Sequence, residues 1–468
     1  MGAGIFGKLH EECGVFGIYM REEGADVLGI THHALYALQH RGQESCGIAV
    51  NDDGVITGHA DTGLVSEVFT EDVLCKLPQG RMAVAHCRYG TTGCQSRENA
   101  QPLVIRHIKG GMALAHNGNL TNAAELRESY ELDGAIFRTT SDSEVIAYAI
   151  TRERIGAGSI EEAVSRAMDS LKGAYSLAVM SPRKLIAVRD PIGFRPLCIG
   201  EIDGGWVVAS ESCALDAIGA KFLRDVEPGE IVTISDRGLE SDRSHCGKAT
   251  GECVFEFIYF ARPDSVIDGS CVHTARQRAG AFLALEHPVQ ADVVIGVPDS
   301  GLDAALGYAR QSGIPYGVGF VKSKYIGRTF IQPGQARRED AVRIKLNTIA
   351  STVRGTTIAR IVGLLREAGA TEVHARLSAP PFLYPCYFGT DIDSSDYLIA
   401  HNHSLEEIRE IIGVDSLGYL NVDYLDKLAD NSTIGFCKGC FTGQYPCEPP
   451  CRAQKSKFEQ KIGRRERD

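Results

Sequence analysis

The sequence predicts two halves of different fold class, an α+β half followed by an α/β half. Residues 13–245 contain short β-branched runs interrupted by glycine and asparagine, which are typical of strands, and two longer helical patterns. After residue 251, apolar strands alternate with helical patterns, which is typical of a parallel sheet covered by helices. A length of 468 residues also favours two domains, each with its own core.

The first half contains three clear apolar runs and two helical patterns. The runs Gly47–Val50, Ala83–His86 and Trp206–Ala209 are predicted strands. The helical patterns cover 141–152 and 159–171. Ser141 precedes Glu144 by three residues, and this spacing predicts a capping box at the start of the first helix.

The polar, glycine-containing segment 241–251 is the predicted connection to the second half. Val293–Val297 is a continuous apolar run, as expected of a strand buried on both faces. Helices are predicted at 302–312 and 358–368, each followed by a glycine, and a strand at 372–377.

The composition indicates which kinds of binding partner and which cellular compartment to expect. The net charge is 49 − 60 = −11 without basic blocks, which argues against nucleic acid or an anionic membrane as a partner. No apolar run is long enough to span a bilayer, and residues 1–12 lack the apolar stretch of a signal peptide. We therefore expect a cytoplasmic location, in which the fifteen cysteines stay reduced and serve metal binding or catalysis.

Cys13 is the first candidate catalytic residue. If residues 1–12 are removed as a propeptide, one residue carries both a thiol and a free amine. On its position alone, Cys13 is more simply explained as a buried structural cysteine. Four later motifs argue against that explanation: His40–Gln43, His86–Gly93, His116–Leu120 and Thr140–Glu144.

In this order after a near-terminal Cys-Gly, the motifs resemble those of the class II glutamine amidotransferases, which are N-terminal nucleophile hydrolases. The resemblance implies a four-layer αββα sandwich over 13–245. It makes Cys13 the nucleophile, and its α-amine, with an ordinary pKa of about 7.7–8.0, can serve as the base. The Asn117 side chain and the Gly118 backbone N–H are implied to stabilise the oxyanion.

The same resemblance implies three glutamine-binding residues. Arg88 would hold the α-carboxylate through a bidentate fork. Asp142 would hold the α-ammonium group. Arg41 would order the loop beside the nucleophile.

Residues 252–436 resemble the type I phosphoribosyltransferases. The fragments that carry this resemblance are Tyr259–Ser265, Val297–Gly301, Lys324–Ile331 and Arg354–Thr357. Over nearly its whole length the chain is similar to the propeptide-processed, iron–sulfur branch of the glutamine phosphoribosylpyrophosphate amidotransferases. That family makes 5-phosphoribosylamine from glutamine and 5-phosphoribosyl 1-pyrophosphate, the first step of purine biosynthesis. The resemblance also implies a homotetramer that purine nucleotides inhibit.

The phosphoribosyl residues fall in three places. Arg354, Gly355, Thr356 and Thr357 directly precede a predicted helix, where backbone N–H groups suit a 5′-phosphate; a plain threonine-capped helix is the alternative. Asp299, Ser300 and Gly301 end a strand and would face pyrophosphate and Mg²⁺, with Ser300 at the metal. Lys324 and Arg328 belong to a basic stretch that suits either a lid or a solvated loop.

One departure from the family is serious. Type I phosphoribosyltransferases place an apolar strand and two adjacent acids before the 5′-phosphate loop, but here Lys345–Thr352 leads directly into Val353. About a dozen residues are absent, roughly one core strand near 351–353. Either the strand is missing, which would leave a glutaminase with a damaged transferase half acting as a regulatory or ammonia-supplying protein, or the sequence is incomplete there.

The tail 437–468 begins with a Cys437-x-x-Cys440 knuckle, and Cys447 and Cys451 follow. The resemblance implies a [4Fe–4S] cluster, for which four thiolates are suitable ligands: Cys253, Cys386, Cys437 and Cys440. A local zinc site that includes Cys447 and Cys451 is the alternative. A sugar-phosphate aminating enzyme is the alternative activity, against which the Tyr259–Ser265 and Arg354–Thr357 fragments argue.

Overall fold

The computed structural model describes residues 13–90, 96–322, 346–348, 357–390, 392, 394–432 and 434–450. These residues form two compact units. The N-terminal unit comprises residues 13–252 together with 387–390 and 446–450, and the C-terminal unit comprises 253–386 and 392–445. The chain therefore leaves the C-terminal unit after Cys386 and re-enters it after residue 390.

Within the described residues, the first sheet of the N-terminal unit has seven antiparallel strands in the order β11-β9-β10-β1-β4-β2-β3. Helices α1, α2, α3 and α7 pack on its outer face. The strands and helices are β1 (Gly14–Met20), α1 (Val27–Leu38), β2 (Ser45–Asp52), β3 (Val55–Thr62), α2 (Val65–Val68), α3 (Glu71–Leu74), β4 (Met82–Arg88), β9 (Cys198–Ile202), β10 (Gly205–Ala209), α7 (Ser212–Ala217) and β11 (Lys221–Asp225).

The second sheet has six antiparallel strands among the described residues, in the order β13-β12-β8-β7-β6-β5. Helices α4, α5 and α6 cover its outer face. The elements are η1 (Arg97–Asn99), β5 (Leu103–His107), β6 (Gly110–Leu120), α4 (Ala123–Leu132), α5 (Asp142–Gly156), α6 (Ile160–Met168), β7 (Gly173–Met180), β8 (Leu185–Arg189), β12 (Ile231–Ser235) and β13 (Gly238–Asp242).

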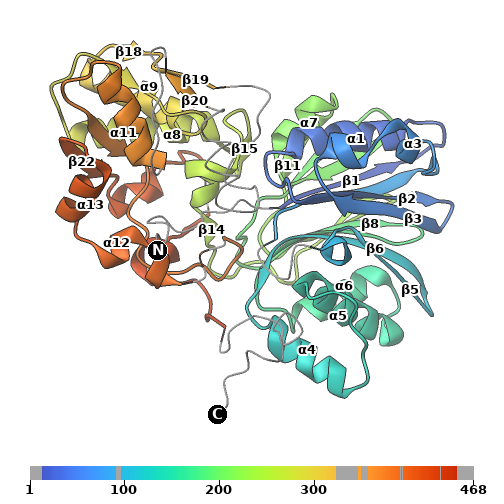
Figure 1. Cartoon of the computed structure of the whole chain (residues 1–468). Coiled ribbons are helices and arrows are strands. Elements are labelled where there is room, and N and C mark those ends of the chain that lie inside the picture. Colours follow the sequence, from blue (N-terminus) through green and yellow to red (C-terminus); the bar gives the residue numbers. More distant parts are fainter. Residues whose placement is uncertain are drawn as a thin grey trace. The chain divides into compact units, whose positions relative to one another are not determined.

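The two sheets face each other across a third apolar cluster, so the unit is a four-layer α-β-β-α sandwich (Figure 1). Strand β1 shows why its sequence is apolar throughout. Phe16 and Ile18 point to the helical layer, whereas Val15 and Tyr19 point between the sheets. A strand covered on both faces needs apolar residues on both faces.

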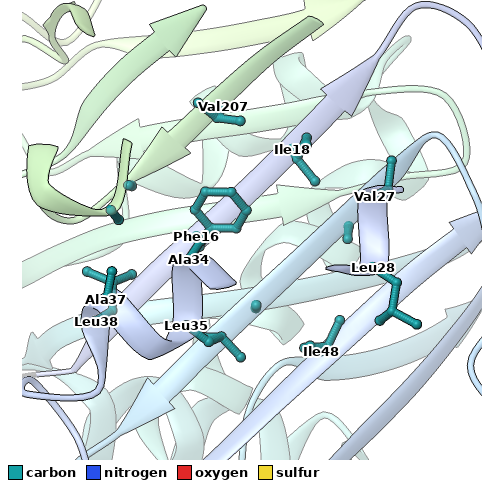
Figure 2. Close-up of a cluster of buried hydrophobic side chains, with 14 of the residues drawn as sticks. Phe16, Ile18, Val27, Leu28, Ala34, Leu35, Ala37, Leu38, Ile48 and Val207 are labelled. Carbon is teal, nitrogen blue, oxygen red and sulfur yellow. The ribbon is translucent and has the colours of Figure 1, made fainter. Parts of the chain in front are cut away.

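Helix α1 covers the first sheet with a narrow apolar stripe. Its buried side chains include Leu28, Ala34, Leu35 and Leu38, which recur at helical spacing. Figure 2 shows them packed over Phe16, Ile18, Ile48 and Val207 of the sheet. Burial of each large side chain of this kind contributes roughly 1.5–3 kcal/mol.

The strands and helices predicted for the first half are present, as β2, β4, β10, α5 and α6. The predicted capping box is wrong in detail. Ser141 accepts a hydrogen bond from Ser143 N, but the Glu144 carboxylate turns away to accept from Arg138 N and Thr139 N. The preceding loop therefore takes the carboxylate that the local pattern assigned to the cap.

The C-terminal unit contains short strands and helices. In chain order they are β14 (Glu252–Cys253), η2 (Glu256–Phe260), β15 (Val266–Ile267), β16 (Ser270–Cys271), α8 (Val272–Glu286), β17 (Val294–Ile295), α9 (Gly301–Ser312), β18 (Tyr316–Gly317), β19 (Phe320–Lys322), β20 (Leu346–Thr348), α11 (Thr357–Glu367), β21 (His374–Leu377), η4 (Ser395–Tyr397), α12 (Ile399–Asn402), α13 (Leu405–Ile412), β22 (Ser416–Tyr419), η5 (Val422–Lys427), β23 (Phe436–Cys437) and α14 (Gly439–Thr442). The predicted helices at 302–312 and 358–368 correspond to α9 and α11.

Parallel pairing is present but does not extend into one sheet. Among the described residues, β17 pairs with β18 and β21 pairs with β22, in two separate parallel sheets. The prediction of a strand buried on both faces at Val293–Val297 is wrong: Val293 is 43% and Val297 37% exposed, and only Val294 and Ile295 pair. Among the described residues, no strand joins β17 to β21.

The junction at which the sequence departs from its family lies mostly outside the described residues, which resume at Thr357 in α11. In the described part of the chain, no helix is long and apolar enough to cross a membrane.

Candidate active site

Cys13 directly precedes β1 and is 9% exposed. Its thiol donates to the carbonyl oxygen of Tyr89 at 3.3 Å, just beyond the end of β4. Gly14 pairs with Cys87 of β4, so the nucleophile candidate is held against the strand that carries Arg88.

Arg41 is buried and contacts the nucleophile candidate directly. Its Nε donates to the carbonyl oxygen of Cys13 at 2.9 Å. Its Nη1 forms an ion pair with the buried Glu211, whose Oε1 also contacts His40 Nε2 at 2.8 Å. The expected role of Arg41 beside the nucleophile therefore has a geometric basis, and Glu211 is a contributor that sequence reasoning missed.

Arg88 is buried at the end of β4 and its Nη1 forms an ion pair with Glu44. The second oxygen of Glu44 accepts from Gly90 N at 2.7 Å. Glu44 was not a predicted site residue, although it directly follows the His40–Gln43 motif. It holds the arginine and the residues directly after β4 together.

Asn117 is the most unusual polar residue in the unit. It is fully buried on β6, and neither its side-chain oxygen nor its nitrogen has a hydrogen-bond partner among the described residues. An amide buried in this state costs about 1–3 kcal/mol unless a ligand uses it. The next residue, Gly118, has a φ of +140°, and a Cβ there would lie 2.2 Å from the Ala174 carbonyl oxygen. Only glycine fits that position.

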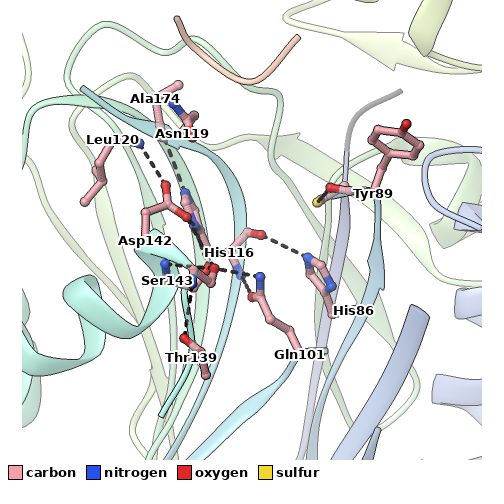
Figure 3. A network of polar contacts seen from close by, with 12 residues as sticks. His86, Tyr89, Gln101, His116, Asn119, Leu120, Thr139, Asp142, Ser143 and Ala174 are labelled. Atoms are coloured by element: carbon pink, nitrogen blue, oxygen red, sulfur yellow. Dashed lines mark hydrogen bonds and ion pairs between the residues drawn. The ribbon is translucent and has the colours of Figure 1, made fainter. Parts of the chain in front are cut away.

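Asp142 begins α5 and faces the same strand. Its Oδ2 accepts from Leu120 N at 2.9 Å, and its Oδ1 lies 3.8 Å from His116 Nδ1. His116 is fixed in turn by Gln101 Oε1 and by Ser143 Oγ (Figure 3). The network places Asp142 beside the strand that carries Asn117 and Gly118.

His86 links the two sheets near the candidate site. It is fully buried, and its Nε2 lies 2.9 Å from the carbonyl oxygen of His116, the residue before Asn117 (Figure 3). Burial is the main cause that lowers the pKa of His86 from 6.5 to about 3; the hydrogen bond to the His116 backbone opposes this shift, and the nearby Arg88 and His116 contribute to it. The ring is therefore neutral at working pH and does not compete with an α-amine as the base.

The phosphoribosyl candidates are described only in part. Asp299, Ser300 and Gly301 lie between the end of β17 and the start of α9, the carboxyl edge that the sequence predicted. Thr357 is the first residue of α11. Five further candidates lie outside the described residues: Lys324, Arg328, Arg354, Gly355 and Thr356.

Four cysteines gather in the C-terminal unit. Cys253 on β14 and Cys437 on β23 lie in paired strands. The carbonyl oxygen of Cys440 accepts from Leu383 N and Tyr384 N, which brings Cys386 close. Burial and the charges of the other three cysteines raise the pKa of Cys440 well above its usual value. These four side chains come from three distant parts of the sequence.

Within the described residues, no three His, Cys, Asp or Glu side chains meet as a single metal ion requires. Cys447 belongs to the N-terminal unit, where its pKa is raised to about 12 by burial and by Asp190 and Glu448. Cys451 lies outside the described residues, so the alternative zinc site that includes Cys447 and Cys451 stays a prediction.

Comparison with known proteins agrees with this geometry. The profile of the glutamine amidotransferase domain family matches residues 86–217, which contain Arg88, Asn117 and Asp142. The amidophosphoribosyltransferase of Bacillus subtilis is 48% identical over 458 residues, covering 94% of this chain and 95% of the relative. That of Archaeoglobus fulgidus is 45% identical over 453 residues, covering 94% and 98%. The chain belongs to the amidophosphoribosyltransferase family.

Two solved structures extend the family assignment to the fold. The B. subtilis glutamine phosphoribosylpyrophosphate amidotransferase, complexed with ADP and GMP, has a TM-score of 0.83 at 47% identity, covering 93% of this chain and 98% of its own. A structure described as the allosteric regulatory enzyme of purine biosynthesis has a TM-score of 0.85 at 45% identity, covering 96% and 100%. The activity is therefore that of an amidophosphoribosyltransferase with a glutamine amidotransferase domain, the first step of purine biosynthesis.

Proposed function

We propose that Cys13, once residues 1–12 are removed, hydrolyses glutamine and supplies ammonia for the synthesis of 5-phosphoribosylamine. The observation that carries this proposal is the buried amide of Asn117 on β6, which has no hydrogen-bond partner among the described residues. Its sheet packs against the sheet that contains β1, the strand directly after Cys13. A folded protein keeps such a group where a ligand completes its hydrogen bonds. An oxyanion formed on glutamine is such a ligand.

The reaction follows from the two groups on Cys13. The α-amine takes the thiol proton, and the thiolate attacks the carboxamide carbon of glutamine. Asn117 and the Gly118 N–H hold the oxyanion while the C–N bond breaks. The α-ammonium group of Cys13 gives its proton to the leaving nitrogen, which departs as ammonia. Water then hydrolyses the thioester to glutamate and regenerates the thiol. Cys13 cannot do this while its nitrogen is acylated by Glu12.

Arg88 and Asp142 are proposed to bind the two charged ends of glutamine. Both side chains are buried, and each is held by a neighbour, Arg88 by Glu44 and Asp142 by Leu120 N. Groups fixed in this way lose little further freedom when the substrate binds. A free glutamine zwitterion, rather than a glutamine within a peptide, is the substrate that such a pair selects.

The C-terminal unit is proposed to be a type I phosphoribosyltransferase that uses this ammonia to displace pyrophosphate from C1 of 5-phosphoribosyl 1-pyrophosphate. Support comes from Asp299–Gly301 at the carboxyl end of β17, where α/β sheets bind ligands. Mg²⁺, when bound near Ser300, would neutralise charge on the pyrophosphate.

Further properties are proposals drawn from the relatives. The thiols of Cys253, Cys386, Cys437 and Cys440 would hold a [4Fe–4S] cluster with a structural role. The B. subtilis complex with ADP and GMP supports inhibition by purine nucleotides. A homotetramer and a cytoplasmic location complete the proposal; the described cysteines form no disulfide.

Replacement of the nucleophile tests the glutaminase assignment. Cys13→Ala should abolish glutamine-dependent synthesis and leave residues 1–12 attached, as intact-mass analysis can show. Ammonia-dependent synthesis should persist because it does not need the thiol. Glutamine turnover by the Cys13→Ala protein would contradict the assignment.

A second candidate function is a glutaminase whose transferase half is damaged. The observation that favours it is the separation of β17–β18 from β21–β22 among the described residues. Titration calorimetry with 5-phosphoribosyl 1-pyrophosphate and Mg²⁺ distinguishes the two candidates. Binding supports synthesis, whereas a protein that releases ammonia but binds no phosphoribosyl substrate is a regulatory or ammonia-supplying chain.

A further inference from the structure

A buried carboxylate lies behind the nucleophile and takes no part in the mechanism described so far. The Glu211 side chain has no exposed surface, and neither has that of Arg41. One carboxylate oxygen contacts Arg41 Nη1 and His40 Nε2, and the other accepts from the Cys213 thiol at 3.6 Å. A buried arginine requires such a counter-charge.

The segment Ser210–Glu211 reaches the start of β1 by two routes. Through Arg41, Glu211 is connected to the carbonyl oxygen of Cys13 at 2.9 Å. Next to it, Ser210 Oγ accepts from Val15 N, and Ser210 N donates to the Val15 carbonyl oxygen. The residues on both sides of Gly14 are therefore held by one short turn after β10.

We propose that Glu211 is a positioning residue for the nucleophile: it orients Arg41, which fixes the carbonyl of Cys13 and so the direction in which the thiol and the α-amine project. The proposal rests on the assignment of Cys13 as nucleophile. Once the leader is removed, Cys13 has no preceding peptide to hold it. Its carbonyl is then the backbone group through which the protein can control its orientation.

The central test is Glu211→Gln, which keeps the shape of the side chain and removes its charge. Glutamine hydrolysis should show a kcat about 10- to 100-fold lower with KM within about twofold, because orientation of the attacking group is lost and substrate binding is not. Alkylation of Cys13 by iodoacetamide, followed by peptide mass analysis, should slow to a similar extent.

Glu230→Gln is the matched control. Glu230 is an equally buried carboxylate of the same unit, paired with Arg224 and Ser241, and it contacts no atom of Cys13 or Arg41 in the described contacts. It should lower thermal stability without changing kcat or the alkylation rate. If Glu211→Gln and Glu230→Gln both lose kcat in proportion to their loss of stability, Glu211 is merely structural and the proposal is overturned.

A double-mutant cycle tests the route through Arg41. Arg41→Lys removes the guanidinium group that contacts both Cys13 and Glu211. The double variant, with Glu211→Gln added, should therefore have the same kcat for glutamine hydrolysis as Arg41→Lys alone. Fully additive losses would overturn the proposal. If Glu211→Gln does not fold, Glu211→Asp keeps the charge with a shorter reach and should lower kcat at least about threefold; a wild-type kcat for that variant would overturn it.

Cys13→Ala separates this proposal from the one it rests on. If Cys13→Ala is inactive while Glu211→Gln is fully active, only the positioning role is wrong. If Cys13→Ala still hydrolyses glutamine, the nucleophile itself is wrong.

Discussion

At the residue scale, the site depends on polar groups that are buried before a substrate arrives. Asn117 has no partner for its amide among the described residues, whereas Asp142 and Arg88 are held by neighbours. The unpaired group is the one assigned to a charge that exists only during the reaction. The paired groups are those assigned to charges that the free substrate already carries.

Asn117→Ala tests the oxyanion role. Loss of one preorganised donor should lower kcat for glutamine hydrolysis by about 10²- to 10³-fold with a small change in KM. Stability should hold or rise, because an unsatisfied buried amide is removed. Asn51→Ala is the control: Asn51 is also buried, but its amide bonds Ser181 O and Gly54 N, so that variant should lose stability and keep its kcat. A wild-type kcat for Asn117→Ala would remove Asn117 from the site.

The buried His86 predicts a pH dependence of stability. Its pKa is about 3 in the folded protein, below the ordinary 6.5, so the unfolded chain binds the proton first. The stability that the neutral ring contributes is complete above pH 6.5 and is lost as the pH falls toward 3. Between pH 6.5 and 4 the loss is about 3 kcal/mol.

His86→Gln measures this contribution, because glutamine keeps an N–H donor for the His116 carbonyl and does not titrate. Urea unfolding at pH 7, 5.5 and 4 should show a shallower acid decline for the variant. Asp190 acts in the opposite direction: burial raises its pKa to about 6, so the folded state gains stability as that carboxyl is protonated. The contribution of His86 is therefore the difference between variant and wild type in the free energy of unfolding at each pH. If that free energy falls equally steeply with pH in both proteins, His86 is not buried in its neutral form.

At the element scale, the C-terminal unit depends on one close helix pair. A Cβ on Gly280 of α8 would lie 1.8 Å from the Ala304 carbonyl oxygen of α9, and one on Gly307 would lie 1.9 Å from the Gln277 carbonyl oxygen. The two helices therefore approach through paired glycines. Beside them, β17 and β21 lack a common neighbour strand in the described residues.

Gly280→Ala should force α8 and α9 apart and destabilise the C-terminal unit by about 1–3 kcal/mol, as overpacking does. Gly156→Ala in α5 is the control: the nearest atom to its added methyl is 3.8 Å away, so the change should be neutral or slightly stabilising. Differential scanning calorimetry of both variants gives the comparison. An unchanged transition for Gly280→Ala would show that the helices do not pack this closely.

At the scale of the whole molecule, the two units are not two continuous stretches of sequence. Residues 387–390, which directly follow the candidate cluster ligand Cys386, belong to the N-terminal unit. There the Phe388 ring stacks on Phe194 at 4.2 Å, Arg195 donates to the Phe388 carbonyl oxygen, and Asn119 donates to that of Tyr387. Asn119 is two residues from Asn117, so the inserted segment supports the strand of the candidate active site.

Phe388→Ala should therefore destabilise the N-terminal unit, by about 3–5 kcal/mol, even though Phe388 lies far along the sequence in the other half. Calorimetry should show the glutaminase transition moving to lower temperature, with a fall in glutamine hydrolysis at the temperatures where that unit begins to unfold. Phe282→Ala, which removes a ring stacked on Tyr424 in the C-terminal unit, should move the other transition instead. If Phe388→Ala instead moved the transition of the C-terminal unit, residues 387–390 would not belong to the N-terminal unit.

Much of the candidate site could be predicted from the sequence because its residues lie in short motifs. Cys13, Asn117-Gly118 and Asp142 lie in short motifs, and short β-branched runs and helical patterns predicted β2, β4, α5 and α9. Glu44 and Glu211 were missed because a buried acid that pairs with an arginine has no local signature. Its identity as a partner depends on which strands and turns the fold brings together.

The sequence by itself determined the order of the motifs and the fold class of each half. These features depend on backbone propensity and apolar spacing, which act over a few residues. Only the tertiary structure decided which carboxylate neutralises Arg41 and that residues 387–390 pack with the N-terminal unit. It also decided which buried amide has no hydrogen-bond partner among the described residues. Burial and charge pairing depend on neighbours hundreds of residues away. The exposure of Val293 and Val297 has the same origin, because an apolar run becomes a buried strand only where neighbouring elements cover it.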